Sequence, residues 1–326
     1  TADLEATTAT ATPDEAEVTE RPTPAVLAGH GAATAQVVAA SRHTVIAPPD
    51  TEGLDLEANP EAITPDPLVA PDDLPQVYAD DCDGKSAGEV VRCDYGDPDG
   101  DLTVALVGDS KIAQWADALD EIGQERGWQV RTYYWSACAW VDATILRPDG
   151  EPDMACRAWG EDMTEVLTGD DRPDVVLVSS VKSTAVPPGG GDETREGLVD
   201  GYVERWSLLD EAGVQVVAIA DTVQPGVNLP ECVAESRDDV AACAFPRNEG
   251  SGTQALVAAV ARAENATMVD MNDWVCPAEQ CPPVIGEVMV YRQGSHITNT
   301  YAVSLAEPLE ARMVAAFDGL GVSLRS

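Results

Sequence analysis

The chain has 326 residues, with 58 acidic and 19 basic side chains, and a formal net charge of −39 at pH 7. This charge argues against nucleic acid as a partner, because phosphates would be repelled, and it disfavours docking on anionic lipid through a basic face. A neutral glycan or glycolipid remains compatible, and the charge itself favours solubility in an external environment. The length accommodates one large α/β domain with an extension.

The first 80 residues differ in composition from the rest of the chain. Residues 1–24 are rich in Ala, Thr, Pro and acidic side chains, which predicts a disordered linker. Residues 25–80 contain prolines that favour extended backbone, with one candidate short helix within 27–45. The folded domain is therefore expected over residues 81–326.

Short apolar runs alternate with helical patterns from about residue 100 onward. The runs predict strands at 102–107, 128–134, 174–179, 214–220 and 266–271. The helical patterns lie at 112–126, 157–167, 198–212, 253–264 and 300–317. This alternation is typical of a three-layer αβα fold with a mainly parallel five-stranded sheet. Right-handed crossovers favour the flavodoxin-like strand order 2-1-3-4-5.

Gly108, Asp109 and Ser110 directly follow the first predicted strand and precede the first predicted helix. Open α/β sheets place their ligands at this edge, and the amino end of a helix favours negative charge on a nearby oxygen. Serine acyl transfer passes through an oxyanion, so Ser110 is the candidate nucleophile. We expect Asp109 to brace the nucleophile turn by hydrogen bonds.

Of the three histidines, only His296 is well placed to act as a base. His30 and His43 lie in the amino-terminal stretch, whereas His296 follows a short apolar run at 288–291 and precedes a helix that begins near residue 298 or 299. In a doubly wound fold this loop shares an edge of the sheet with Ser110, which predicts that His296 is the general base. With an ordinary imidazole, Ser–His chemistry fades as the pH falls through about 6.5.

The eight cysteines fall into four local couples, and they indicate an oxidising compartment. Sequential pairing is the simplest interpretation, because each bridge would staple one loop. Zinc is the alternative, but the chain has no CxxC pair and no paired histidines, so no metal site is predicted. The expected disulfides are Cys82–Cys93, Cys138–Cys156, Cys232–Cys243 and Cys276–Cys281.

The chain shows neither an apolar run of bilayer-spanning length nor a signal peptide at its start. In a cysteine-rich chain this combination leads us to expect a mature or excised part of a longer protein.

The sequences VGDS at 107–110 and YRQGSH at 291–296 resemble the SGNH (GDSL-type) hydrolase superfamily. The chain is most similar to one branch, the extracytoplasmic SGNH domain fused behind an acyltransferase-3 membrane domain. The supporting motifs are AQW at 113–115, SAC at 136–138, CRAW at 156–159 and DWVC at 273–276. The resemblance covers roughly 81–317. It implies the SGNH-hydrolase fold, a membrane acyltransferase domain in the same polypeptide, and a 25–80 segment that connects the two and packs on the domain.

The chain departs from the family pattern beside both catalytic residues. Gln293 stands where the family usually has an aspartate three residues before its histidine, and Lys111 stands where this branch often has histidine. A glutamine oxygen could fix the imidazole ring, but it stabilises the imidazolium less than a carboxylate does. Three alternatives stay open: a Ser–His dyad oriented by a neutral group, a domain that binds without catalysing, or a substitute carboxylate from Asp270, Asp273 or Glu287.

The oxyanion-hole blocks of the family are not recognisable, although Ser136 and Ser180 fall near the corresponding positions and are the candidate donors. Lys111 is either a cation for substrate or oxyanion, or an exposed side chain at a helix start. Four aromatic residues near the end of the second strand either line a sugar-binding cleft or pack in the core: Tyr133, Tyr134, Trp135 and Trp140.

The resemblance implies an extracytoplasmic O-acyltransferase that works through a Ser110–His296 acyl-enzyme. The acyl group would be acetyl from acetyl-CoA, delivered by the membrane domain, with no cofactor in this domain. The acceptor would be a hydroxyl of a cell-envelope glycan or glycolipid. Two alternatives accompany this reading: a carbohydrate esterase with the same serine, and a catalytically impaired glycan-binding module.

Overall fold

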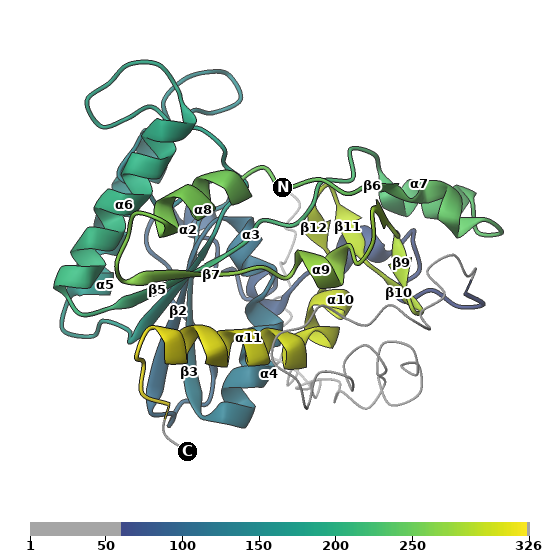
Figure 1. The fold of residues 1–326 in the computed structure, drawn as a ribbon, viewed down its shortest axis with the longest axis horizontal. Coiled ribbons are helices and arrows are strands. Elements are labelled where there is room, and N and C mark those ends of the chain that lie inside the picture. Colours follow the sequence, from purple (N-terminus) through teal and green to yellow (C-terminus); the bar gives the residue numbers. More distant parts are fainter. Residues whose placement is uncertain (1–59, 325–326) are drawn as a thin grey trace, which may run out of the picture.

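A central sheet of six strands organises the part of the chain that the structure, a computed structural model, describes, which is residues 60–324. The predicted linker at 1–24, the candidate helix within 27–45, His30 and His43 lie outside the described residues. The strands are β1 (Cys93–Gly96), β2 (Leu102–Gly108), β3 (Trp128–Tyr134), β4 (Val175–Ser179), β5 (Gln215–Ile219) and β7 (Ala266–Val269). Figure 1 labels β2, β3, β5 and β7 of this sheet, which lie between two groups of helices.

The strand order is β1-β3-β2-β4-β5-β7, and all neighbours are parallel except β1, which runs antiparallel to β3. The five predicted strands therefore have the expected order 2-1-3-4-5. The sixth strand, β1, was missed because its four residues form no apolar run; Asp94 is exposed and the other three are half-buried. The predicted mainly parallel α/β fold is confirmed, with one antiparallel strand added at the edge.

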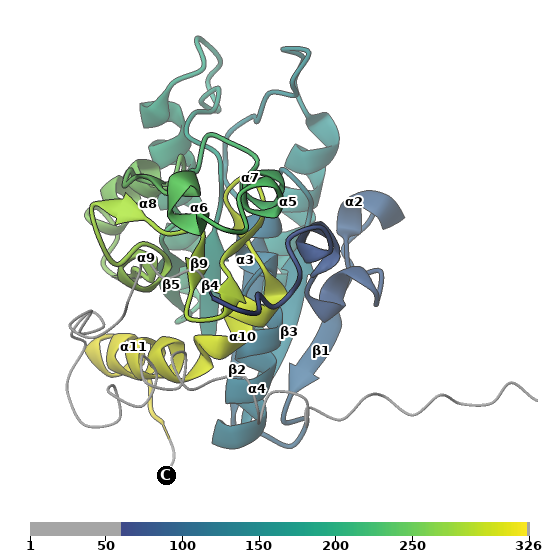
Figure 2. The ribbon, with the colours of Figure 1, turned by 90° about the vertical axis from the view of Figure 1, so that its right-hand side faces the viewer.

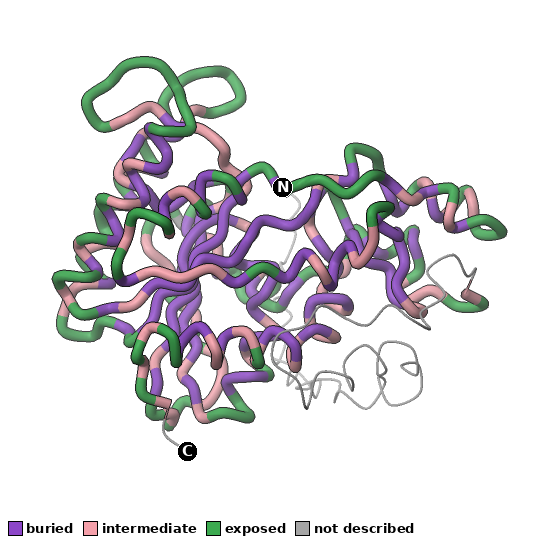
Figure 3. Tube along the Cα trace, in the orientation of Figure 1, coloured by how far each residue is buried: buried purple, intermediate pink, exposed green. Residues whose placement is uncertain are grey.

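Helices cover both faces of the sheet, which explains the continuous apolar character of its strands. Along β2, Val104 and Leu106 pack into the core that contains α4 and α11, whereas Ala105 and Val107 pack into the core that contains α5, α6 and α8. Strands β2, β3, β4 and β5 are buried almost throughout, and Figure 3 shows this as a purple bundle between the helices. The helices in these two layers are α4 (Ala116–Arg126), α5 (Met154–Thr168), α6 (Arg195–Glu211), α8 (Thr253–Val260) and α11 (Ala306–Gly319).

Two helices predicted as continuous are each broken in the structure. The pattern over 112–126 divides into α3 (Ser110–Ala113) and α4, because the end of α3 tightens so that the Trp115 amide donates to the Ile112 carbonyl. The pattern over 300–317 divides into α10 (Asn299–Ser304) and α11 at Leu305. Pro308 explains the second break, because a residue without an amide hydrogen is tolerated only in the first turn of a new helix.

Short elements gather beyond the carboxyl edge of the sheet, on the right in Figure 1 and facing the viewer in Figure 2. Three two-stranded pairs join β6 to β8, β9 to β10 and β11 to β12. The elements are α7 (Leu229–Glu235), a 3-10 helix (Val240–Cys243), β6 (Phe245–Pro246), α9 (Asn272–Val275), β8 (Gln280–Cys281), β9 (Val284–Ile285), β10 (Val288–Met289), β11 (Tyr291–Gln293) and β12 (His296–Ile297). The β11–β12 pair matters most, because it carries the predicted base.

The described part of the amino-terminal extension packs against this region. It forms two 3-10 helices, Ala70–Asp72 and Gln76–Tyr78, and a short helix α2 (Gly84–Ala87). Thr64 pairs with Val288, and the Asn299 amide at the start of α10 donates to the Asp73 carbonyl over 3.1 Å. Ala70 and Val77 are fully buried. Residues 60–83 are therefore part of the packed structure around the carboxyl edge.

The cysteines form the four sequential disulfides that were expected, Cys82–Cys93, Cys138–Cys156, Cys232–Cys243 and Cys276–Cys281. Disulfides of this number are typical of an oxidising, extracytoplasmic compartment. Among residues 60–324, no helix has the length and apolarity required to cross a membrane.

Candidate active site

A sharp turn at the end of β2 presents Ser110 to the carboxyl edge of the sheet. Gly108 has a φ of +147°, and a Cβ atom there would lie 2.6 Å from the Ser179 carbonyl oxygen of the neighbouring strand. Only glycine fits both conditions. Asp109 then caps α3 by accepting a hydrogen bond from the Lys111 amide over 2.8 Å, so that Ser110 begins the helix.

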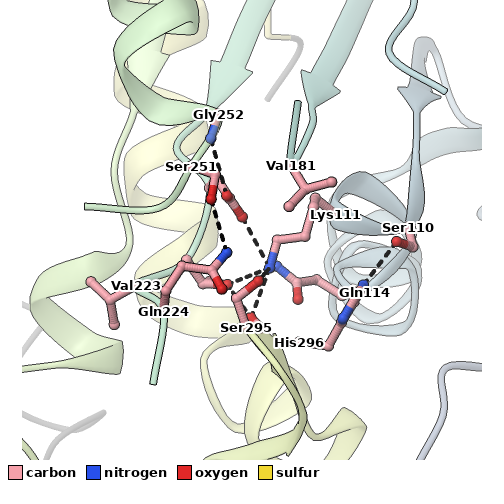
Figure 4. A network of polar contacts seen from close by, with 12 residues as sticks. Ser110, Lys111, Gln114, Val181, Val223, Gln224, Ser251, Gly252, Ser295 and His296 are labelled. Atoms are coloured by element: carbon pink, nitrogen blue, oxygen red, sulfur yellow. Dashed lines mark hydrogen bonds and ion pairs between the residues drawn. The ribbon is translucent and has the colours of Figure 1, made fainter. Parts of the chain in front are cut away.

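Ser110 and His296 meet at this edge, although 186 positions separate them in the chain. The distance from Ser110 Oγ to His296 Nε2 is 2.8 Å, a hydrogen bond of normal length (Figure 4). Both side chains are partly exposed, whereas their neighbours Asp109, Lys111, Ser295 and Ile297 are buried. The pair therefore has the contact required for proton transfer and an opening toward solvent.

The other imidazole nitrogen faces a main-chain carbonyl. His296 Nδ1 lies 3.3 Å from the backbone oxygen of Gln293. Because a carbonyl can only accept, this contact favours the tautomer with the proton on Nδ1 and leaves Nε2 free to accept the proton of Ser110. The prediction that the Gln293 side chain orients the ring is therefore corrected: Gln293 is exposed, and its backbone provides the acceptor.

The three carboxylates considered as substitutes for the missing aspartate have other partners or positions. Asp270 accepts hydrogen bonds from the backbone and side chain of Asn272, and Asp273 forms an ion pair with Arg247 at 2.7 Å. Glu287 contributes its backbone carbonyl to Thr64. His296 has none of them among its hydrogen-bond partners in the described structure, so the arrangement is a dyad oriented by a neutral group.

The environment of His296 keeps its imidazole neutral. Burial, together with the positive charges of Lys111 and Arg292, lowers the pKa of His296 to about 3, while the hydrogen bond to the Gln293 carbonyl acts in the opposite direction. The expectation of an ordinary imidazole pKa near 6.5 is therefore wrong for this site. His296 stays in the base form well into the acidic range.

The orienting contact leads to a prediction about Gln293. Because its backbone carbonyl faces His296, Gln293→Ala should retain the contact and change kcat by no more than about twofold, as for other exposed substitutions. Gln293→Asp tests the alternative that the side chain at position 293 orients the imidazole. A gain in rate would show that the new carboxylate reaches the ring. Steady-state hydrolysis of p-nitrophenyl acetate measures both variants, and a loss of tenfold or more in Gln293→Ala would contradict the main-chain assignment.

Asp109 joins the nucleophile turn to the end of β4. Its Oδ2 accepts hydrogen bonds from the Ser180 hydroxyl at 2.7 Å and the Val181 amide at 3.0 Å, in addition to the capping bond at Oδ1. The predicted bracing role agrees with this geometry. Burial raises the pKa of Asp109 to about 6, since desolvation of the carboxylate outweighs these three hydrogen bonds.

This raised pKa predicts a pH-dependent stability. Between about pH 4 and pH 6 the folded protein holds the Asp109 proton and the unfolded chain has lost it, so the free energy of unfolding falls as the pH rises. The shift corresponds to about 3 kcal/mol. In Asp109→Asn this contribution is absent, so chemical denaturation at pH 4 and pH 7 should show a smaller difference than in the parent chain. Asp99→Asn, at an exposed turn, is the matched control, and an equal slope in parent and Asp109→Asn would refute the assignment.

The structure contradicts both predictions for Lys111, which placed its side chain either at the substrate or in solvent. Its side chain is fully buried, and Nζ forms an ion pair with Asp221 at 3.0 Å and donates to the Ser295 carbonyl at 2.7 Å (Figure 4). It is thus neither an exposed side chain at a helix start nor a cation free to bind substrate or oxyanion. Sequence reasoning missed Asp221, although its place directly after a strand at the carboxyl edge was a usable signal.

The two predicted oxyanion donors are engaged with carboxylates. Ser136 donates its hydroxyl to Asp83 over 2.6 Å and its amide to the same carboxylate over 3.1 Å. Ser180 donates to Asp109 and accepts from the Lys182 amide. Each hydroxyl would have to give up its present bond before it could donate to an oxyanion.

The four aromatic residues near the end of β3 belong to the core. Their exposed fractions are 4% for Tyr133, 2% for Tyr134, 5% for Trp135 and 1% for Trp140. These four side chains therefore pack in the core and do not line a sugar-binding cleft. In the described part of the chain, no group of three or more His, Cys, Asp or Glu side chains is arranged to hold a metal ion.

A nucleophile turn and a carboxy-terminal histidine in hydrogen-bonding contact are the features that carried the resemblance in the sequence. The family model for the SGNH domain fused to AT3 domains matches residues 78–311. The chain belongs to this SGNH-domain family. The match spans the whole sheet and includes both Ser110 and His296, so the departures at Lys111 and Gln293 occur within an otherwise recognisable member.

Two solved structures resemble this SGNH domain at low sequence identity. The lipopolysaccharide acetyltransferase periplasmic domain of Salmonella ser. Paratyphi A is 13% identical, with a TM-score of 0.49, and the match covers 66% of this chain and 85% of that one. A structure assigned as an acylhydrolase from Bacteroides fragilis is 11% identical, with a TM-score of 0.38, and the match covers 69% and 90%. Similarity at this level does not bear on function. None of the curated proteins compared with the chain matches it.

Proposed function

We propose that this SGNH domain is an extracytoplasmic O-acyltransferase that carries an acyl group on Ser110. The observation that supports the proposal best is the 2.8 Å contact between Ser110 Oγ and the unprotonated Nε2 of His296. Membership of a family fused to AT3 domains supports a membrane acyltransferase domain in the same polypeptide as the source of the acyl group. The donor is acetyl derived from acetyl-CoA, and the domain itself needs no cofactor.

The first half of the reaction transfers the acyl group to the enzyme. Ser110 Oγ attacks the acyl carbonyl while His296 Nε2 takes the hydroxyl proton. The tetrahedral intermediate collapses, the bond to the leaving group breaks, and the leaving group takes the proton from the imidazolium. The result is an ester on Ser110 and a neutral His296.

The second half passes the acyl group to an acceptor hydroxyl. His296 takes the proton of that hydroxyl, its oxygen attacks the Ser110 ester, and Ser110 leaves with the proton returned by the imidazolium. We assign the acceptor to a neutral cell-envelope glycan or glycolipid, since the net charge of −39 disfavours polyanions. If water enters instead of a sugar hydroxyl, the same dyad acts as a carbohydrate esterase.

The partition between acceptors tests this proposal. The chain is incubated with p-nitrophenyl acetate, with and without a high concentration of a neutral oligosaccharide, and the acetyl products are separated by mass spectrometry. An acyltransferase should give acetylated sugar and release p-nitrophenol faster when sugar is present, if deacylation limits the rate. Acetate as the sole product would favour the esterase. Failure of a fluorophosphonate to label Ser110 in folded protein would favour a glycan-binding module.

A further inference from the structure

The Lys111 ammonium is the centre of a fully buried polar cluster beside the dyad. Nζ lies 3.0 Å from Asp221 Oδ1, 2.7 Å from the Ser295 carbonyl and 3.1 Å from the Ser295 hydroxyl. It also donates to the Thr222 hydroxyl, which in turn donates to the same Ser295 carbonyl. Lys111, Asp221, Thr222 and Ser295 are all buried, with exposed fractions of 4% or less. We call these four residues the lysine cluster.

The lysine cluster joins the backbones of the nucleophile and the base. Lys111 follows Ser110 in α3, and Ser295 precedes His296 in β12, so the Ser295 carbonyl belongs to the peptide unit that includes the His296 amide. Figure 4 shows the Lys111 side chain extending from the helix that carries Ser110 toward Ser295. One ammonium group therefore holds the two segments whose separation sets the Ser110–His296 distance.

Asp221 ties this ammonium to the rigid sheet. It follows β5, its Oδ2 accepts from the Gly252 amide at 3.2 Å, and its carbonyl accepts from Asn272 Nδ2 at 3.0 Å. A buried ammonium is stable only when it is paired with a carboxylate and its hydrogen bonds are satisfied. The Lys111–Asp221 ion pair thus anchors the cluster where β5, α8 and α9 converge.

Within the described residues, the imidazole itself makes two hydrogen-bond contacts, one to Ser110 and one to the main chain. His296 Nδ1 has the Gln293 carbonyl at 3.3 Å as its acceptor, which is a long contact to a neutral group. The β11–β12 pair is short, and its turn passes through Gly294 at a φ of +53°. The position of the ring consequently depends on how well the backbone around Ser295 is fixed.

We propose that Lys111 and Asp221 are positioning residues that hold His296 against Ser110 in place of the missing triad aspartate. The assignment rests on the proposed acyl-transfer function of the dyad. Lys111 contacts neither Ser110 Oγ nor the imidazole directly. It acts through the Ser295 carbonyl and hydroxyl.

The charge of Lys111 adds an electrostatic consequence. Lys111 from α3 and Arg292 from β11 both lower the pKa of His296, while the Gln293 carbonyl raises it. Asp109 and Asp221 contact Lys111 itself, at its amide and its ammonium respectively. Removing the ammonium should therefore raise the pKa of His296 and move the acid limb of the rate profile to higher pH.

Removing both charges of the Lys111–Asp221 ion pair distinguishes a positioning role from a role in the stability of the fold. K111M or D221N alone leaves one buried charge unpaired and should lower the Tm by roughly 10 °C. K111M/D221N removes both charges and should regain most of that loss. Its kcat for p-nitrophenyl acetate should nevertheless stay about 10²-fold below the parent value, because the His296 segment has lost its anchor.

An exposed ion pair gives the matched control. Arg262 and Asp200 lie 2.7 Å apart with side chains 42% and 47% exposed, outside the lysine cluster. R262M/D200N makes the same chemical change and should leave kcat and the pH profile within about twofold of the parent, as expected for surface substitutions.

The tautomer of His296 can be measured by NMR without any enzymatic turnover. Nitrogen chemical shifts of His296 in the parent chain should report a single tautomer with the proton on Nδ1, and K111M/D221N should report an averaged ring. A folded K111M/D221N with parental kcat, acid limb and tautomer would overturn the positioning role. If the parent chain fails to react with a fluorophosphonate, the acyl-transfer proposal fails, and the nitrogen shifts still decide the role of the cluster.

Discussion

Ser110→Ala should lower acyl transfer and ester hydrolysis by about 10⁴-fold or more, the loss typical of removing the nucleophile of a serine enzyme. The reason is structural: Ser110 carries the hydroxyl held at 2.8 Å from His296 Nε2, and alanine leaves the imidazole without an oxygen to activate. The measurement is kcat with p-nitrophenyl acetate, together with the intact mass of the protein after treatment with a fluorophosphonate. The mass should rise by one phosphonyl group in the parent chain and remain unchanged in Ser110→Ala.

Ser207→Ala is the matched control for this experiment, because Ser207 is exposed on α6 and donates to the Glu204 carbonyl within its own helix. It should keep parental kcat and full labelling. Labelling of Ser110→Ala at parental stoichiometry would place the reactive hydroxyl elsewhere. Unchanged turnover in that variant would show that Ser110 does not carry the acyl group.

The rate should persist at acidic pH far better than in an enzyme with an ordinary histidine. Burial and the nearby cations lower the pKa of His296 to about 3, so the imidazole remains neutral at pH 5. A base with a pKa near 6.5 would be almost fully protonated there and would lose roughly thirtyfold in rate. We therefore expect kcat/KM at pH 5 to lie within about twofold of its value at pH 7, with the acid limb only near the folded-state pKa.

The rate of Ser110 labelling by a fluorophosphonate provides a second measurement of the same ionisation over the same pH range. The Tm at each pH serves as the control, because a loss of folded protein would imitate a loss of base. An acid limb centred near pH 6.5 in folded protein would contradict the lowered pKa. The low pKa also makes His296 a weak base, so we expect a moderate maximal rate.

A dyad of this kind shows what a carboxylate normally contributes. An aspartate both selects the histidine tautomer and stabilises the imidazolium during attack. Here the Gln293 carbonyl can do the first, whereas the cations Lys111 and Arg292 oppose the second. We expect the imidazolium to be short-lived and the acyl-enzyme to form slowly, unless a bound substrate brings compensating negative charge.

Local sequence was sufficient for the fold, the disulfides and the identity of the dyad. Buried parallel strands are continuous apolar runs whatever packs on them, so five strands and their order could be predicted. The glycine at 108 and the serine at 110 mark a strand-to-helix turn that any chain of this class must build in the same way. The short edge strand β1 escaped prediction because it lacks an apolar run, and the break at Trp115 because it depends on a single backbone hydrogen bond. The break at Leu305 had a local signal, Pro308, that sequence reasoning did not use.

Only the tertiary structure could decide how the side chains around the dyad are used. Whether Lys111 is exposed depends on Asp221, which follows a different strand 110 residues later, and whether Gln293 orients the ring by its side chain or its carbonyl depends on the turn at Gly294. Such choices are set by desolvation and by hydrogen-bond partners that are distant in the chain, and no local pattern records them. The sequence by itself determined which residues could react, and the three-dimensional arrangement determined which partners hold them and in what state of charge.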